Sequence, residues 1–227
     1  MKIIKNNIKA VIFDMDGTII DTEKIWKNIT KQYLQKKGFL TLSQQQEQIL
    51  DSLSGIGLEK ACLILKKEFK IANPIEEMMQ EKIVLAKPQM LNNVEFIKGF
   101  QEFAYQLKNN SIPAGIATNA DGDTLATLNK KMNFENFFGK NIFCAEHVGN
   151  KLKPDPAVFL HTADKLNAKP EECLVFEDSI HGFMAAQKAN MKCIAIKNTI
   201  NKDQLHLVHG YIDNYAQAEE TIKKLIK

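Results

Sequence analysis

The alternation of predicted strands and helices along this chain is interrupted once, and that interruption constrains the fold more than any other feature of the sequence. A short apolar run at residues 9–13, ended by an acidic turn, predicts a strand. Residues 21–93 then show apolar positions at helical spacing only, and strands return from residue 94 onward in alternation with helices. Such alternation predicts a parallel sheet that is covered by helices on both faces.

The interruption predicts two domains. We expect an α/β fold with a Rossmann-like, three-layer core and a parallel sheet, formed by residues 1–20 and 94–227. An all-helical domain is expected to be inserted into this core at residues 21–93. A chain of 227 residues is long enough for a core with such an insertion.

The composition argues against several classes of protein. The hydrophobic fraction of 44% and the charged fraction of 25% are those of a folded globular chain rather than a disordered one. The net charge of +3 is scattered without a basic stripe, so we expect no nucleic-acid partner.

No apolar run approaches the ~20 residues that span a bilayer, and the apolar stretch after the lysine-rich start ends at Asp14. We therefore expect a cytoplasmic protein without membrane contact, and we expect a monomer. The four cysteines are widely spaced in apolar contexts, which predicts reduced thiols that bind no metal.

Polar residues follow four of the predicted strands at the point where each strand ends. They are Asp14 and Asp16, Thr118 and Asn119, Lys153 beyond a short loop, and Glu177 and Asp178. Each group alone also fits a common structural role, as a turn, a helix cap or an exposed loop lysine. Together they would meet at the carboxyl edge of the sheet, where open α/β sheets bind ligands. Four carboxylates at that edge repel one another unless a cation binds among them, and oxygen ligands on short loops favour Mg²⁺.

The ordered set of these residues resembles a known family. The motifs Asp14-x-Asp16-Gly-Thr, Thr118, Lys153-Pro and Glu177-Asp178 resemble those of the haloacid dehalogenase (HAD) superfamily of phosphohydrolases, and the resemblance covers nearly the whole chain. The helical insertion after the first motif is similar to that of the helical-capped, β-phosphoglucomutase-like branch, which includes sugar-phosphate phosphatases. The resemblance implies that residues 21–93 form a cap and that the substrate is a small phosphorylated metabolite.

The resemblance also implies roles for the first and fourth motifs. Asp14 would be the nucleophile that forms an aspartyl-phosphate intermediate, and Asp16 would be the general acid and base. A Mg²⁺ cofactor would be bound by the carboxylate of Asp14, the carbonyl oxygen of Asp16 and the side chain of Asp178.

The remaining motif residues are expected to bind phosphate or to support the other groups. Thr118 and the loop amide of Asn119 would hydrogen-bond to phosphate oxygens, and Lys153 would pair with both the nucleophile and the phosphate. Glu177 is expected to support the site without binding the metal directly, because adjacent side chains on an extended segment diverge.

Departures from the family pattern favour one reaction over the others. True dehalogenases lack the second aspartate of the first motif, so Asp16 argues against dehalogenation. The mutases of this branch carry a histidine and a phosphate-gripping arginine on the cap, where this chain has Trp26 and Leu58. All 30 Lys and Arg positions are lysine, so no guanidinium is available for a second phosphate. We therefore predict a phosphatase, with a phosphosugar mutase as the alternative and a non-catalytic binding protein as the third hypothesis.

Substrate choice is expected to depend on the inserted domain. The segment with Gly55, Ile56 and Leu58 either faces the substrate or is a simple turn between helices. Trp26 either stacks on a sugar ring or packs inside the helical domain. A sugar or polyol phosphate is the predicted substrate class, and the sequence leaves the individual substrate open.

Overall fold

The computed structural model describes residues 8–53 and 58–226. The chain forms two compact units, which we call the core unit (Met1–Ile20 with Phe96–Lys227) and the helical unit (Asp21–Glu95). The chain leaves the core unit after Ile20 and returns to it at Phe96, while the predicted roles of a catalytic core and a cap stay predictions. The backbone N–H of Asp21 donates to the carbonyl oxygen of Glu95 at 2.9 Å, so the two connecting segments are joined where the helical unit begins and ends.

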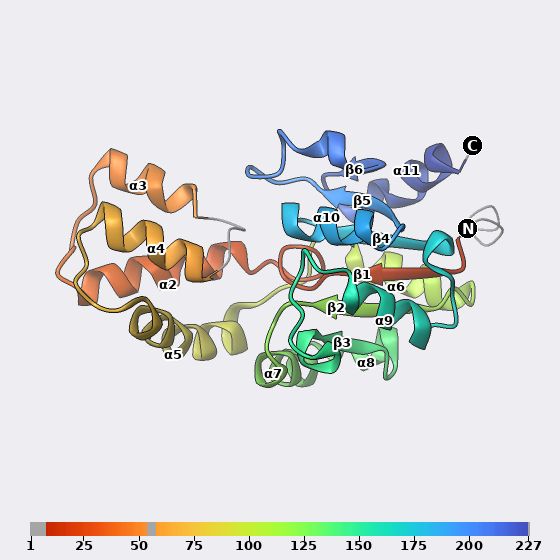
Figure 1. Ribbon diagram of the computed structural model, residues 1–227, viewed down its shortest axis with the longest axis horizontal. Helices are drawn as coiled ribbons and strands as arrows, with labels where there is room; N and C mark the ends of the chain where they lie inside the picture. The colour runs from red at the N-terminus through yellow and green to blue at the C-terminus, as the bar shows by residue number, and fades with distance from the viewer. Residues whose placement is uncertain (1–7, 54–57, 227) are drawn as a thin grey trace. The chain divides into compact units, whose positions relative to one another are not determined.

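The core unit is built on a parallel six-stranded sheet with the strand order β3-β2-β1-β4-β5-β6 (Figure 1). The strands are β1 (Ala10–Phe13), β2 (Ala114–Thr118), β3 (Ile142–Cys144), β4 (Cys173–Glu177), β5 (Lys192–Ile196) and β6 (Gly210–Ile212). Strands β2 and β4 pair with opposite sides of β1. The strand order therefore switches sides at β1: β2 and β3 extend the sheet on one side of it, and β4, β5 and β6 extend it on the other. The predicted fold class, an α/β core with a parallel sheet, is confirmed.

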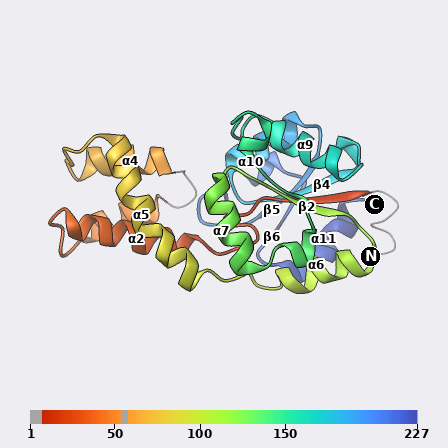
Figure 2. The ribbon, with the colours of Figure 1, turned by 90° about the horizontal axis from the view of Figure 1, so that it is seen from below.

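Helices cover both faces of this sheet, with α9 and α10 on one face and α6 and α11 on the other (Figure 2). The helices of the core unit are α6 (Phe100–Asn109), α7 (Gly122–Met132), α8 (Glu135–Phe138), α9 (Ala157–Lys165), α10 (Ile180–Lys188) and α11 (Ala218–Leu225). Single 3₁₀ turns are η1 (Ala145–Val148), η2 (Pro170–Glu172), η3 (Leu205–Leu207) and η4 (Tyr215–Gln217).

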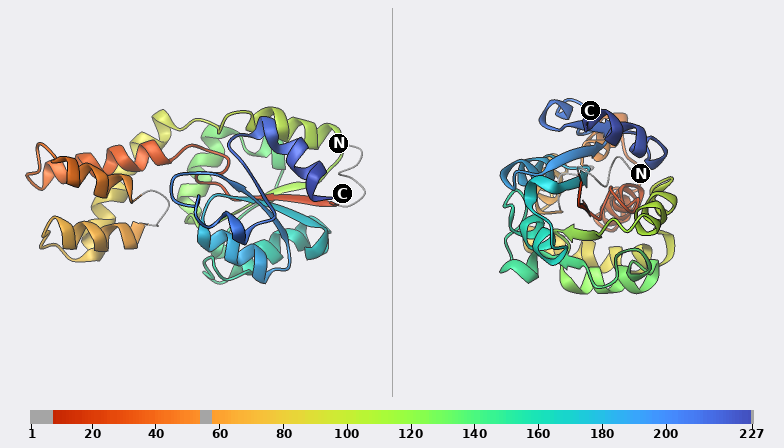
Figure 3. Two further views of the ribbon diagram at one scale, coloured as in Figure 1. Left: turned by 90° about the horizontal axis from the view of Figure 1, so that it is seen from above. Right: turned by 90° about the vertical axis from the view of Figure 1, so that its right-hand side faces the viewer.

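Strand β1 lies in the middle of the core unit and is completely buried (Figure 3). On one face, Ala10 and Ile12 pack in the cluster that includes residues of α9 and α10. Phe13 belongs to an aromatic cluster instead, with its ring 5.3 Å from that of Phe176 and 5.6 Å from that of Phe100. The alternation of side chains along one strand thus fills both layers beside the sheet and fixes the position of the residue that follows it.

Only helices are found among the described residues of the helical unit. They are α2 (Glu23–Lys36), α3 (Gln44–Asp51), α4 (Leu58–Glu68) and α5 (Ile75–Asn93). They enclose a separate apolar core, which includes Leu34 of α2, Leu65 of α4 and Met78 of α5. None of the described helices of the chain has the length and apolar character that crossing a membrane requires.

Candidate active site

The residues that follow β1 and β4 come together at the carboxyl edge of the sheet. Phe13 pairs with Phe176 in the parallel register, so Asp14 and Glu177 are neighbours one residue later. The backbone N–H of Asp14 donates to the carbonyl oxygen of Phe176 at 3.0 Å and extends this pairing. Carboxylate oxygens of Asp14, Glu177 and Asp178 lie within 4.8 Å of one another. We call these three residues the acidic cluster.

Lys153 supplies a buried positive charge to the acidic cluster. Its Nζ donates to Oδ1 of Asp14 at 2.6 Å and to Oε2 of Glu177 at 2.8 Å. The ammonium also lies 4.5 Å from the ring centre of Phe159, which closes its apolar side. Because Lys153 lies in the loop before α9, its backbone needs support from elsewhere. Asn119 provides it: the side chain of Asn119 accepts from the N–H of Lys153 at 2.9 Å and donates to its carbonyl oxygen at 3.5 Å.

Glu177 is enclosed by donors from its own chain. Its Oε1 accepts hydrogen bonds from the backbone N–H groups of Asp178 and Ser179, both at 3.1 Å, and from the Ser179 hydroxyl at 2.9 Å. Its Oε2 accepts from Lys153. The first turn of α10 passes so close that a Cβ on Gly182 would lie 1.9 Å from the Glu177 carboxyl carbon. Glu177 therefore joins the end of β4, the start of α10 and Lys153.

Asp178 is held from two sides. Gly17, with a φ of +75°, passes so close that a Cβ at this position would lie 2.1 Å from Oδ2 of Asp178. From the loop after β5, the side-chain amide of Asn198 donates to the carbonyl oxygen of Asp178 at 3.1 Å and to its Oδ2 at 3.3 Å. Asn201 donates to the same carbonyl oxygen at 2.7 Å. Neither asparagine was predicted, although both follow the apolar run at residues 192–196, which predicts a fifth strand, and polar side chains after strand ends were expected at the site.

The acidic cluster holds more negative charge than the ammonium of Lys153 can neutralise. Burial, with the charge of Glu177, raises the pKa of Asp14 to about 7, although Lys153 acts in the opposite direction. Burial also raises the pKa of Asp178 well above its ordinary value, with Glu177 and Asp14 adding to the shift. Burial alone would lower the pKa of Lys153, but Asp14 and Glu177 outweigh it and the pKa is raised. One ammonium thus faces three carboxylates, and a cation bound by oxygen atoms would correct the imbalance.

Asp16 and Thr118 lie beside the acidic cluster. Asp16 is half-buried in the turn after Asp14, and its charge adds to the raised pKa of Asp14. Thr118 is the buried last residue of β2, and its Oγ1 accepts from the backbone N–H of Ala120 at 3.0 Å. The predicted residues of the core unit are therefore gathered at one edge of the sheet.

The other predicted residues belong to the helical unit. Trp26 is half-buried on α2, and its carbonyl oxygen accepts from the hydroxyl of Thr30 at 2.8 Å. Leu58 is packed against the apolar core of the helical unit. Gly55 and Ile56 lie outside the described residues. A role of these four positions in substrate choice stays a prediction.

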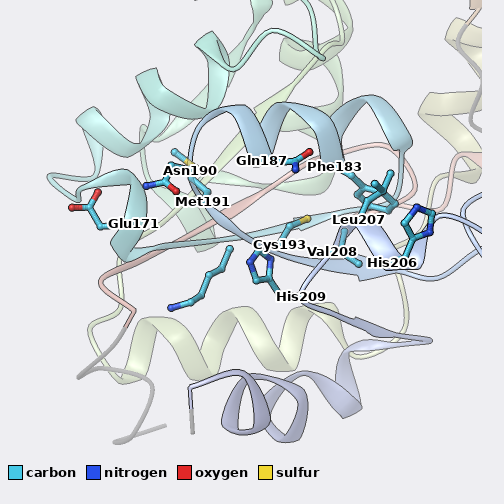
Figure 4. Close-up of a pocket in the computed structure, with 11 residues that line it drawn as sticks. Glu171, Phe183, Gln187, Asn190, Met191, Cys193, His206, Leu207, Val208 and His209 are labelled. Carbon is cyan, nitrogen blue, oxygen red and sulfur yellow. The ribbon is translucent and has the colours of Figure 1, made fainter.

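A pocket of about 490 Å³ lies beside α10 and is lined by none of the three residues of the acidic cluster (Figure 4). It is lined by residues of α10, of the turn after α10, of the first part of β5 and of the segment before β6, among them Phe183, Gln187, Met191, Cys193, His206 and His209. None of the residues predicted for catalysis lines it. Cys193, which lines the pocket, lies near the amino end of β5. The acidic cluster instead lies at the carboxyl ends of the strands.

The chain is similar to known proteins over most of its length. Residues 11–196 match the family described as haloacid dehalogenase-like hydrolase. A phosphorylated carbohydrates phosphatase of Thermotoga maritima is 26% identical over 90% of this chain and 93% of its own length. A bifunctional riboflavin kinase/FMN phosphatase of Arabidopsis thaliana is 27% identical over 98% of this chain, which spans 55% of the length of that relative.

A solved structure shows the same fold. The crystal structure of a HAD family hydrolase from Deinococcus radiodurans, with bound phosphate and sodium, has a TM-score of 0.79 at 21% identity and covers 96% of each chain. The matched residues 11–196 run from the second residue of β1 to the end of β5, and they include every residue of the acidic cluster and Lys153. The resemblance inferred from the motifs is confirmed: the chain belongs to the haloacid dehalogenase-like hydrolase family.

Proposed function

We propose that this hydrolase is a Mg²⁺-dependent phosphatase that acts on a small sugar or polyol phosphate through an aspartyl-phosphate intermediate. The observation that carries the proposal is the acidic cluster with Lys153, a group of three close carboxylates of which two, Asp14 and Glu177, are buried and paired with one ammonium. Such a cluster suits phosphoryl transfer, which needs a positioned nucleophile and neutralisation of the phosphate charge.

The donors of the cluster fit Mg²⁺. The carboxylates of Asp14 and Asp178 offer oxygen atoms, which hard divalent cations prefer, and the carbonyl oxygen of Asp16 is the third proposed ligand. The raised pKa values of Asp14 and Asp178 indicate that the described residues leave negative charge uncompensated there. When bound, Mg²⁺ would offset the charge of the phosphate and of the carboxylates.

Asp14 is the proposed nucleophile. Lys153 holds its Oδ1, so we assign attack on phosphorus to Oδ2. The new bond joins Oδ2 to phosphorus while the bond from phosphorus to the leaving oxygen breaks, and Asp16 gives that oxygen a proton. Asp16 then takes a proton from the water that attacks the aspartyl phosphate, which releases inorganic phosphate and restores Asp14.

Three further groups are proposed to bind the phosphate. The hydroxyl of Thr118 and the ammonium of Lys153 would contact its oxygens. The side chain of Asn119 is engaged with the backbone of Lys153, so its proposed contribution is the backbone N–H. Glu177 is proposed to orient Lys153 and the start of α10, because its oxygens accept from those groups.

The helical unit is proposed to act as the cap that selects the leaving group. The Thermotoga relative is named for phosphorylated carbohydrates, which supports a sugar or polyol phosphate as the substrate class. All basic residues of the chain are lysines, so a second phosphate would have no bidentate partner. Trp26, Gly55, Ile56 and Leu58 are the proposed specificity positions.

The test is release of inorganic phosphate from a panel of sugar and polyol phosphates. Asp14→Asn should reduce turnover by at least about 10³-fold because the nucleophile is lost. Asp164→Asn, at an exposed position on α9, is the matched control and should retain the activity. Removing divalent cations with a chelator should abolish turnover, and Mg²⁺ should restore it. Turnover by Asp14→Asn would refute the assignment of the nucleophile, and an isomeric sugar phosphate in place of inorganic phosphate would identify a mutase.

A further inference from the structure

The loop after β5 is fixed by two asparagine side chains. Oδ1 of Asn198 accepts from the backbone N–H groups of Ile200 at 2.9 Å and Asn201 at 2.8 Å. Oδ1 of Asn201 accepts from the backbone N–H of Asn198 at 3.0 Å. Nδ2 of Asn201, which is completely buried, donates to the carbonyl oxygen of Ile196 at 2.8 Å. The two side chains therefore lock the loop to the end of β5.

These bonds leave one orientation for the Asn198 amide. Because its oxygen receives two backbone N–H groups, its nitrogen must be the atom that faces Asp178. That nitrogen lies 3.3 Å from Oδ2 of Asp178 and 3.1 Å from the carbonyl oxygen of the same residue. Gly17 closes the other side of Oδ2. The carboxylate of Asp178 is thus held between a fixed donor and a close backbone.

The chemical nature of the donor matters. An ammonium, such as that of Lys153 beside Asp14, attracts a carboxylate by its charge and competes with a metal ion for it. An amide donates a hydrogen bond but leaves the full negative charge on the carboxylate. Residues that hydrogen-bond to metal-binding carboxylates orient them and tune affinity. Asp178 is therefore held by the kind of donor that suits a cation ligand.

We propose that Asn198 is a positioning residue for cation binding, which acts by orienting the carboxylate of Asp178 toward the acidic cluster. The inference rests on the proposed Mg²⁺-dependent function. According to this inference, the segment after β5 also belongs to the site, beside the segments that follow β1, β2 and β4. The loop of residues 197–201 would then contribute to metal affinity.

The experiment compares Mn²⁺ binding by the substrate-free protein, followed by the electron paramagnetic resonance of free Mn²⁺. Asn198→Ala removes the amide. Asn198→Ser also removes the donor to Asp178, but its hydroxyl can still accept from the N–H groups of Ile200 and Asn201 and so preserve the turn. Both variants should bind Mn²⁺ about 10- to 100-fold more weakly than the unsubstituted protein. Asn110→Ala is the control, because that side chain donates to the carbonyl oxygen of Gln106 at the end of α6.

A second measurement separates positioning from a general structural effect. In the Asn198 variants, the Mg²⁺ concentration for half-maximal activity should rise by a similar factor, and saturating Mg²⁺ should restore most of kcat. A loop that is merely damaged would instead lower kcat at every Mg²⁺ concentration, and that result would overturn the inference. Unchanged Mn²⁺ affinity of Asn198→Ser would overturn it as well. If the unsubstituted protein binds no Mn²⁺, the proposed Mg²⁺-dependent function fails, and the inference fails with it.

Discussion

Two buried lysines, one in each unit, have opposite surroundings. Lys153 is 6% exposed in the core unit, and Lys82 is 2% exposed in α5 of the helical unit. The ammonium of Lys153 contacts two carboxylates, at 2.6 and 2.8 Å. Among the described residues, the partner of the Lys82 ammonium is the hydroxyl of Thr30, at 2.9 Å, and no carboxylate pairs with it. The same residue type is thus buried once with counter-charges and once without.

The pKa values of the two lysines move in opposite directions for this reason. Burial lowers the pKa of Lys82, and the nearby thiol of Cys62 opposes the shift without reversing it. In Lys153, Asp14 and Glu177 reverse the effect of burial and raise the pKa. Burial alone therefore does not distinguish the lysine of the proposed active site. The carboxylates around Lys153 distinguish it, and they also make its removal harmful.

The largest effect is expected from Lys153→Met. The substitution leaves Asp14 and Glu177 buried without their cation, and breaking a buried ion pair in this way typically costs about 3–5 kcal/mol. Urea unfolding at pH 8 without divalent cations should show a loss of this size in the free energy of unfolding. Lys165→Met, at a half-exposed position on α9, is the control and should change it by less than about 0.5 kcal/mol. Equal stability of Lys153→Met and the unsubstituted protein would show that the ion pairs do not form.

The position of Lys153 at the edge of the sheet could be predicted from the sequence, because the order of the motifs along the chain indicates which strand ends meet there. Short apolar runs at residues 9–13, 112–117, 141–145, 173–176 and 192–196 predict five strands, and the ends of β1 to β5 lie within two residues of these bounds. Parallel pairing then forces Asp14, Glu177 and Asp178 to the same edge. Strand β6 (Gly210–Ile212) was missed, because three residues with an exposed Tyr211 give no alternating pattern.

Lys82 shows what the sequence could not provide. It stands in a helix between charged and apolar neighbours, as an exposed lysine would. Its burial arises from the packing of α5 against both α2 and α4, which no local pattern encodes. Asn198 is a different case: its position after a strand was visible, but an asparagine in a loop is typical of a turn. Its hydrogen bond to Asp178 depends on the folded loop.

A second prediction concerns the pH dependence of the core unit without divalent cations. The pKa of Asp14 is about 7 in the folded protein, whereas the ordinary pKa of a solvated aspartate, as in the unfolded chain, is 3.8. The folded protein therefore binds more protons between about pH 4 and 7, and its free energy of unfolding should fall as the pH rises through this window. One group contributes at most about 1.4 kcal/mol per pH unit. Asp14→Asn should flatten this slope in urea unfolding, and an identical slope in the variant would contradict the prediction.

The smallest effect, and the sharpest contrast with Lys153, is expected from Lys82→Met. The substitution removes a buried charge that has no carboxylate partner, and Thr30 is not left unpaired, because its hydroxyl still donates to the carbonyl oxygen of Trp26 at 2.8 Å. We expect the free energy of unfolding at pH 7 to rise by about 1–2 kcal/mol.

The pH dependence provides an independent check on Lys82. Its pKa is lowered in the folded protein, so the unfolded chain binds more protons between that value and 10.5, and stability should rise with pH in this alkaline window. Lys82→Met should lose this rise, whereas the control Lys67→Met, at an exposed position on α4, should keep it. If Lys82→Met instead destabilised the protein as much as Lys153→Met does, the ammonium of Lys82 would have to be compensated like that of Lys153. The distinction between the two lysines would then be wrong.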